Sequence, residues 1–183
     1  GGVAMEFIVK APPDGYTLFQ CNIASSAIAE SLYLKLGYDH PRDFAPITRI
    51  GTTPNALVVH PSMPAKSMKE FIAYAKANPG KLSYGSSGAG SSPHLSMELL
   101  KLMTKTNIVH VSYKGAPQAM SDVMAGQIES GMTNIPLIIA PIQAGRMRGL
   151  AVTSAKRVSQ ISHVPTMIES GLNGYEVYSW YGV

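Results

Sequence analysis

The sequence predicts an α/β fold, because short β-rich runs alternate with helical segments along most of the chain. Three strand-loop-helix units follow one another between residues 82 and 144, and a further strand, Gly149–Thr153, comes after them. Such a succession favours a parallel sheet with right-handed crossovers. In open α/β sheets ligands bind beyond the carboxyl ends of the strands, so the loops after these strands form the candidate site.

The first part of the chain predicts four elements. They are a strand at Leu18–Asn22, a short helix at Ser25–Leu34, a strand at Ala56–His60, and a helix that Ser67 caps and that runs through Ala77. Pro61 stops the second of these strands, since proline cannot donate to a sheet. The sequence Asn78-Pro79-Gly80 ends the second helix.

The three central units have similar expected layouts. Their strands are Leu82–Gly85, Ile108–Ser112 and Ile128–Met132, and their helices are Pro93–Lys105, about Pro117–Ala125 and about Pro136–Ala144. Leu95, Leu99 and Leu102 are expected to form the apolar face of the first of these helices.

Composition narrows the class of protein. The chain has 183 residues, of which 45% are hydrophobic and 14% charged, and its net charge is +4. Basic residues are scattered rather than clustered, so we expect no nucleic-acid partner. No apolar run is long enough to span a bilayer. The single cysteine, Cys21, forms no internal disulfide, and its apolar neighbours predict a buried thiol. The five histidines show no metal-ligand spacing, and no cofactor is expected.

The most informative stretch is the loop Gly85–Leu95. Ser92 is expected to be the N-cap of the following helix, with Pro93 in its first turn. Glycines let the loop backbone approach a ligand, and the helix dipole adds positive potential, so the loop predicts an anion site. A plain flexible loop with a cap is the alternative interpretation. The G-x-G-x-x-G and P-loop patterns are both absent, which argues against a phosphate-rich cofactor.

Two further loops open helices at the same predicted edge. The first is Tyr113-Lys114-Gly115, where the Lys114 ammonium is expected in solvent and the backbone N–H groups are the better ligands. The other is Thr133-Asn134, whose side chains either hydrogen-bond a ligand or cap a helix. Three helix N-termini at one sheet edge strengthen the prediction of an anion site.

A Ser/His hydrolase is an alternative that the sequence supports poorly. Ser87 or Ser91 would be the nucleophile and His94 the base. The G-x-S-x-G elbow is absent, and His94 lies at the positive end of a helix, where a protonated imidazole is disfavoured. The preferred interpretation of His94 is a neutral residue that braces the loop, and we expect no enzyme activity.

The chain resembles the Bug family, the substrate-binding proteins of tripartite tricarboxylate transporters. Matching stretches run nearly end to end and in order; they include Ala11–Leu18, Asp43–Ile47, Lys81–Ser86, Ser92–Leu95, Val111–Gly115, Ala125–Ile128, Asn134–Pro136, Ala144–Arg157, His163–Thr166 and Glu169–Leu172. The resemblance implies a periplasmic binding protein of type II-like fold, with two Rossmann-like lobes that close on a small carboxylate. It also implies membrane transporter subunits as partners and a periplasmic location.

By position, the family's pocket falls on residues of both lobes. In the second lobe these residues are Ser86, Ser87, Gly88, Gly90, Ser91, Ser92, His94, Lys114, Gly115, Thr133 and Asn134; in the first they are Asn22, Ser25 and Ser26. Family members often carry Asp where Thr133 stands, which puts binding of an amino-acid ligand in doubt.

The resemblance also predicts how the chain divides. Residues 54–176 are expected to form a complete second lobe, and residues 1–53 with 177–183 part of the first. The family's N-terminal Gly-rich loop, its C-terminal helices and a signal peptide are not found in this sequence. We therefore expect weak ligand binding, and a homodimer through uncovered apolar residues such as Phe7 and Leu18. A sensory ligand-binding protein is an alternative to a transport receptor.

Overall fold

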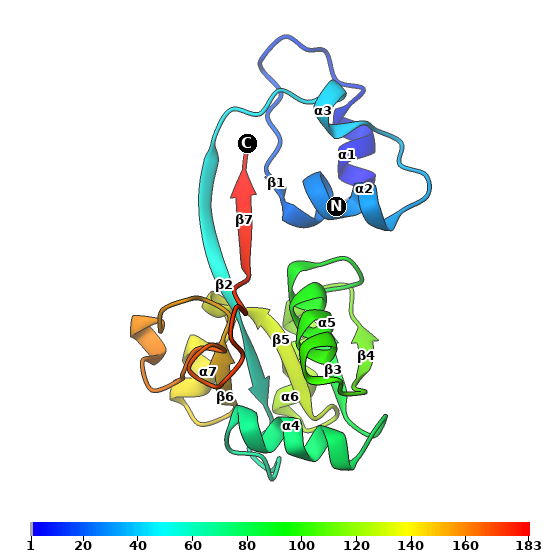
Figure 1. The fold of residues 1–183 in the computed structure, drawn as a ribbon. Coiled ribbons are helices and arrows are strands. Elements are labelled where there is room, and N and C mark those ends of the chain that lie inside the picture. The colour runs from blue at the N-terminus through cyan, green and yellow to red at the C-terminus, as the bar shows by residue number, and fades with distance from the viewer. Residues whose placement is uncertain (1) are drawn as a thin grey trace. The chain divides into compact units, whose positions relative to one another are not determined.

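The computed structural model, which describes residues 2–183, contains two separately packed units (Figure 1). The second unit comprises Pro54–Tyr178, and the first comprises the chain up to Thr53 together with Ser179–Val183. Among the described residues, no helix is long and apolar enough to cross a membrane.

The second unit is built on a mixed sheet with the strand order β6-β2-β5-β3-β4. Its strands are β2 (Arg49–Val59, which begins in the first unit), β3 (Ser83–Ser86), β4 (Val109–Ser112), β5 (Ser130–Asn134) and β6 (Arg148–Val152). Strand β3 pairs in parallel with both β4 and β5, whereas β2 runs antiparallel to β5 and β6. The parallel arrangement expected for the strands of the central units is confirmed for β3, β4 and β5, whereas β2, which precedes these units, runs antiparallel to its neighbours.

Helices cover both faces of this sheet. One face packs on α4 (Met68–Ala77) and α5 (Ser92–Thr104), through a core that contains Phe71, Met97 and Leu100. The other face packs on α6 (Ala116–Met124) and α7 (Ile139–Gln143), with the 3₁₀ turns η2 (Ile135–Leu137) and η3 (Ser159–Ile161) nearby. Alternate β2 residues enter the two cores, as a strand with both faces buried requires.

Local signals predicted the start of α4 correctly and the bounds of two other helices only approximately. Ser67 caps α4, as expected, by accepting a hydrogen bond from the Glu70 N–H. The N-cap of α5 is Ser91 rather than Ser92, because the Ser91 hydroxyl accepts from the His94 N–H. The last predicted helix is shorter than expected, since a 3₁₀ turn precedes α7.

The predicted apolar face of α5 is wrong for Leu95 and Leu102, whereas Leu99, its third residue, does pack against the core. Leu95 is 37% exposed and Leu102 is 76% exposed, whereas Met97 and Leu100 are buried. The helix carries apolar residues on two sides, and the side centred on Met97 and Leu100 is the one that packs on the sheet.

The first unit is less regular than its sequence predicted. It contains α1 (Gly2–Ile8), β1 (Cys21–Asn22), the π-helical turn η1 (Ala24–Ile28), α2 (Ala29–Leu32) and α3 (His40–Asp43). Strand β1 is thus shorter than expected, and pairs antiparallel with β7 (Tyr178–Gly182). The predicted helix at 25–34 is divided between η1 and α2. Cys21 is half-buried rather than buried.

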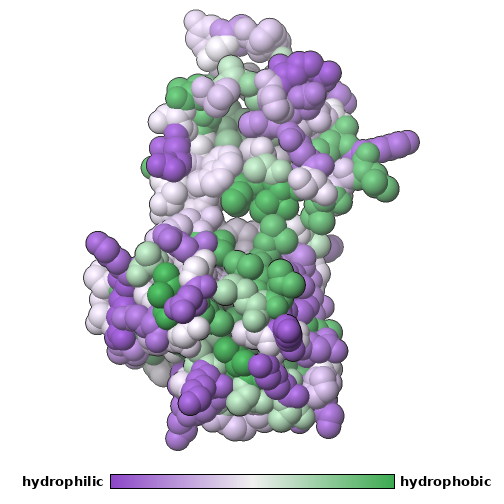
Figure 2. All heavy atoms as spheres, viewed as in Figure 1, coloured by the Kyte–Doolittle hydropathy of each residue, from purple (hydrophilic) through white to green (hydrophobic). Residues whose placement is uncertain are grey.

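Many apolar side chains of the first unit are exposed. Phe7 is 75% exposed, Leu18 is 65% exposed and Leu34 is fully exposed. In Figure 2, hydrophobic residues reach the surface among polar ones over the part of the chain that carries α1, α2 and α3. The second unit therefore contains most of the buried core.

Candidate functional site

The carboxyl ends of β3, β4, β5 and β6 meet at one edge of the second unit's sheet. This follows from the pairing, because β3, β4 and β5 are parallel and β6 has the same direction as β5 relative to β2. The loops 87–91 and 113–115 leave this edge into α5 and α6. Since β3 lies between β4 and β5, its loop is flanked by the other two predicted loops.

The loop after β3 is held by hydrogen bonds within itself. The Ser91 hydroxyl donates to the Gly88 carbonyl at 2.7 Å, and the Gly88 N–H donates to the Ser86 hydroxyl at 3.2 Å. The Gly90 N–H donates to His94 Nδ1 at 3.2 Å. Ser86 and Ser91 thus shape the loop, and the N–H groups of its two central glycines are occupied.

Other donors of the same loop remain available. The N–H groups of Ser87 and Ala89, and the Ser87 hydroxyl, have no hydrogen-bond partner among residues 2–183. Ser87 is half-buried and Ala89 is exposed, so a ligand can reach both from solvent. These donors lie just before the N-terminus of α5, where the helix dipole favours an anion.

The loop after β4 offers a second set of donors beside the first. In the described chain, the N–H groups of Lys114 and Gly115 have no hydrogen-bond partner, and α6 has no side-chain cap. A Cβ on Gly88 would lie 3.3 Å from the Tyr113 carbonyl oxygen, so the two loops are in close contact. Gly88 also has a φ of +121°, which side chains rarely adopt.

The end of β5 carries Thr133 and Asn134 within the strand rather than in a loop, which corrects the predicted end of that strand. Thr133 is fully buried, and its hydroxyl has no hydrogen-bond partner in the described part of the chain. Asn134 instead donates from Nδ2 to Asn55 Oδ1 at 2.7 Å. The Thr133 hydroxyl is therefore enclosed and unpaired among the described residues, whereas the Asn134 amide is engaged in the fold.

Asn55 connects the strands of this edge to α5. Its side chain is fully buried, and Nδ2 donates to the hydroxyls of Ser92 and Ser96, both at 2.8 Å. Its N–H donates to the Thr153 hydroxyl at 2.8 Å. The predicted site residue Ser92 thus belongs to a buried network that holds the helix start against β2 and β5.

Two histidines lie under the loop after β3. The His94 and His110 rings stack at 4.3 Å, and His110 stacks on Tyr84 at 4.8 Å. Burial lowers the pKa of both imidazoles, and the opposing charge of Glu98 does not offset it. Burial therefore favours the neutral form of both rings.

The hydrolase alternative finds no support in these contacts. His94 Nδ1 accepts the Gly90 N–H, and the Ser91 hydroxyl donates to a carbonyl, so neither group activates the other. Ser86 does lie 2.7 Å from His110 Nε2, but its side chain is completely buried. A nucleophile needs both a base and access to its substrate.

The predicted residues of the first unit form a local turn. Asn22 Oδ1 accepts from the Ala24 and Ser25 N–H groups at 3.0 and 3.2 Å, and the Ser25 hydroxyl donates to the Asn22 carbonyl. The Ser26 hydroxyl is buried and has no partner among the described residues. Asn22 and Ser25 thus stabilise the start of η1, and Ser26 keeps an unused hydroxyl.

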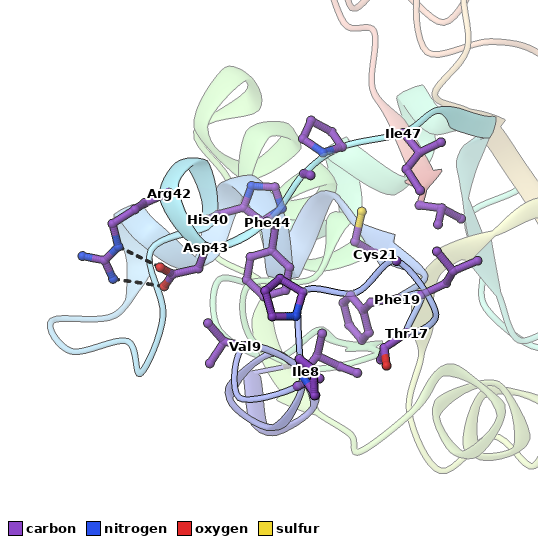
Figure 3. Close-up of a pocket in the computed structure, with 18 residues that line it drawn as sticks. Ile8, Val9, Thr17, Phe19, Cys21, His40, Arg42, Asp43, Phe44 and Ile47 are labelled. Carbon is purple, nitrogen blue, oxygen red and sulfur yellow. Dashed lines mark hydrogen bonds and ion pairs between the residues drawn. The ribbon is translucent and has the colours of Figure 1, made fainter.

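The first unit also contains a cavity of about 560 Å³ (Figure 3). Its lining is largely apolar and includes Ile8, Phe19 and Phe44. The charged groups at its rim, Arg42 and Asp43, pair with each other at 2.7 Å. None of the predicted binding residues is among its described lining residues, so this cavity does not explain the anion-binding pattern.

Comparison with known proteins identifies the family. The model of the Tripartite tricarboxylate transporter family receptor matches residues 1–183. The chain belongs to this receptor family. It is 32% identical to Protein BugT of Bordetella pertussis over 184 residues, which cover 100% of this chain and 56% of BugT. The expected resemblance to Bug proteins is thereby confirmed.

Two solved structures have the same fold. The structure of R. palustris Rpa4515 with adipate is 40% identical, with a TM-score of 0.95, and is covered to 61%. MatC (Rpa3494) from Rhodopseudomonas palustris with bound malate is 26% identical, with a TM-score of 0.90, and is covered to 62%. All of this chain matches the first structure and 99% of it the second. The predicted periplasmic-binding-protein fold is confirmed, and the chain spans little more than half of BugT.

The sequence analysis does not predict two residues that organise this edge of the sheet, Asn55 and His110. Asn55 stands directly before the predicted strand 56–60. Its only signal in the sequence is that asparagine is uncommon in strands. His110 lies within a predicted strand, and its contacts with Ser86 and His94 arise only when β3 and β4 pair.

Proposed function

We propose that this chain is the ligand-gripping part of an extracytoplasmic receptor that captures a small carboxylate for a tripartite tricarboxylate-type transporter. The observation that carries the proposal is the set of unpaired donors at one sheet edge. The N–H groups of Ser87, Ala89, Lys114 and Gly115 lack hydrogen-bond partners among the described residues and lie in the loops that lead into α5 and α6. Donors of this kind favour a carboxylate.

The chemistry of the same edge favours binding over catalysis. Loops 87–91 and 113–115 contain no acidic side chain, so no carboxylate in these loops repels an anion. Among the described residues, no group of three or more His, Cys, Asp or Glu side chains could hold a metal ion. Neither serine hydroxyl of the loop is bonded to an imidazole, because the Ser91 hydroxyl donates to the Gly88 carbonyl and the Ser87 hydroxyl has no partner in the described chain. These features support a binding role for this edge rather than a catalytic one.

The ligand class follows from the family together with these donors. Adipate and malate, which are both dicarboxylates, are bound to two receptors of the same fold. Two groups of donors on neighbouring loops suit a ligand with more than one carboxylate. We infer that the ligand is a dicarboxylate or tricarboxylate, that the protein acts in the periplasm, and that membrane subunits of the transporter are its partners.

Calorimetric titration with adipate, malate, citrate, an aromatic acid and glutamate tests this proposal. We expect saturable binding of at least one dicarboxylate or tricarboxylate, and Ser87→Ala should weaken it by about ten- to a hundredfold, the value of one hydrogen bond to a charged group. Ser121→Ala, an exposed serine on α6, is the matched control and should leave affinity unchanged. Equal affinities of wild type and Ser87→Ala would contradict the assignment of this loop.

A further inference from the structure

Three stacked rings connect the sheet to the anion-binding loop. Tyr84 of β3, His110 of β4 and His94 of α5 stack in this order, with centroid separations of 4.8 and 4.3 Å. The last two rings are imidazoles, which can change charge near neutral pH. The three stacked rings therefore place two titratable groups in direct contact beside the loop.

Each imidazole is bound to one end of that loop. His94 Nδ1 accepts the Gly90 N–H at 3.2 Å, and His110 Nε2 lies 2.7 Å from the Ser86 hydroxyl. The same hydroxyl accepts the Gly88 N–H at 3.2 Å. The bond from Gly90 requires that His94 Nδ1 carries no proton, because a protonated nitrogen cannot accept.

The charged groups that face the imidazoles are few. Glu98 and Lys101 come from α5, and the Tyr84 hydroxyl comes from β3. Glu98 Oε1 already accepts from Lys101 and from Tyr84, each at 2.7 Å, and lies 4.0 Å from His94 Nε2. Burial is the largest influence on the pKa of His94 and lowers it; the Glu98 carboxylate raises that pKa and the Lys101 ammonium lowers it, so it stays below its ordinary value.

We propose that the neutral His94–His110 pair holds the anion loop in its ligand-binding shape, and that protonation of the pair in mildly acidic solution releases the loop and weakens carboxylate binding. Protonated His94 would direct an N–H at the Gly90 N–H, so the bond that fixes Gly90 is replaced by a repulsion. Two imidazolium ions 4.3 Å apart would also repel each other. Burial lowers the pKa of both groups, so the change lies below the ordinary histidine value of 6.5.

This proposal rests on the proposed function for its effect on affinity, but its structural part can be tested without ligand. His94→Asn places an amide oxygen near the position of Nδ1, and so accepts the Gly90 N–H at every pH. His94→Ala has no acceptor and should leave the loop unbraced throughout. Comparison of the two variants separates the effect of the bond from the Gly90 N–H from the effect of protonating His94.

The first measurement is the hydrogen-exchange protection of the Gly90 amide in the 183-residue chain between pH 7.5 and 5, corrected for intrinsic exchange. We expect protection to fall on acidification in wild type, to stay constant in His94→Asn, and to be low at all pH values in His94→Ala. Protection that stays constant with pH in wild type, or that falls equally in wild type and His94→Asn, overturns the proposal.

The second measurement is the affinity for adipate over the same pH range. Both proteins encounter the same ionisation of adipate, so the ratio of the wild-type Kd to the His94→Asn Kd isolates the imidazole. We expect this ratio to rise about three- to tenfold from pH 7.5 to 5, the value of one net hydrogen bond. A constant or falling ratio overturns the effect on affinity. If adipate binds to neither protein at any pH, the proposed ligand class fails for adipate, and the exchange measurement still decides the loop mechanism.

Discussion

Truncation of Asn55 should destabilise the second unit more than any other single polar substitution at this edge. Asn55→Ala removes the two bonds to Ser92 and Ser96 and the bond from Asn134. A net intramolecular hydrogen bond contributes about 0.5–1.5 kcal/mol, so three contribute about 1.5–4.5 kcal/mol. Because the residue is fully buried, water does not replace the lost partner, and we expect a loss of about 2–4 kcal/mol.

Urea unfolding followed by far-ultraviolet circular dichroism measures this loss. A change of about 3 kcal/mol should also lower Tm by about 6–12 °C, since domains of this size lose about 2–4 °C per kcal/mol. The control is Gln118→Ala, which removes an exposed amide from α6 and should change stability by less than about 0.5 kcal/mol.

The result that would refute this reasoning is a loss for Asn55→Ala no larger than that for Gln118→Ala, with an unchanged m-value. Such a result would mean that the buried bonds of Asn55 are replaced as the site relaxes. A changed m-value would instead indicate an altered native or unfolded state, and the free energies could then not be compared directly.

Three further predictions concern packing and pH. Gly85→Ala should lower the free energy of unfolding by about 1–3 kcal/mol, because a Cβ there would lie 2.7 Å from Ile128 Cδ1. Urea unfolding measures this loss, and an unchanged midpoint would contradict the prediction. Arg148→Ala should lower the free energy of unfolding by about 1–3 kcal/mol in the same assay, because the guanidinium donates to three backbone carbonyls of the segment 61–65 at 3.1–3.2 Å. Equal stability of variant and wild type would show that these bonds are dispensable. The folded-state pKa values of His94 and His110 are lowered, so the unfolded chain binds more protons below about pH 6.5 and stability should fall as pH falls from there towards the folded-state values. Thermal unfolding at pH 7.5 and 5.5 checks this dependence, which should be smaller in the double variant His94→Asn/His110→Gln.

The sequence was informative where local chemistry sets the structure. The alternation of strands and helices through residues 82–144 is confirmed, because glycine, proline and capping residues act within a few positions of themselves. The cap of α4 by Ser67 is one such case. The gathering of the loops at one sheet edge follows in turn, because parallel neighbours place their carboxyl ends together.

Contacts between distant residues could not be predicted in this way. Asn55 meets partners that are 37, 41 and 79 positions away, and those distances depend on the antiparallel placement of β2. The exposed side of α5 shows a related problem. Leu95 and Leu102 match a helical period as well as Met97 and Leu100 do, and only the position of the sheet decides which side is buried.

The functional prediction was coarse for the same reason. The loop after β3 was recognised from its glycines and serines, but the sequence could not separate the groups that shape the loop from those left for a ligand. In the structure, the hydroxyls of Ser86 and Ser91 are used internally, whereas the Ser87 hydroxyl and N–H remain available. That distinction depends on side-chain hydrogen bonds, which a spacing pattern does not specify.

The most direct test of a carboxylate site at this edge is a two-dimensional ¹⁵N–¹H spectrum of the chain titrated with adipate or malate. The amides without partners in the described chain, those of Ser87, Ala89, Lys114 and Gly115, should shift together and saturate at one ligand concentration. Amides around the first unit's cavity, such as Phe19 and Phe44, should keep their positions. Saturable shifts confined to that cavity, with the four loop amides unchanged, would contradict the account.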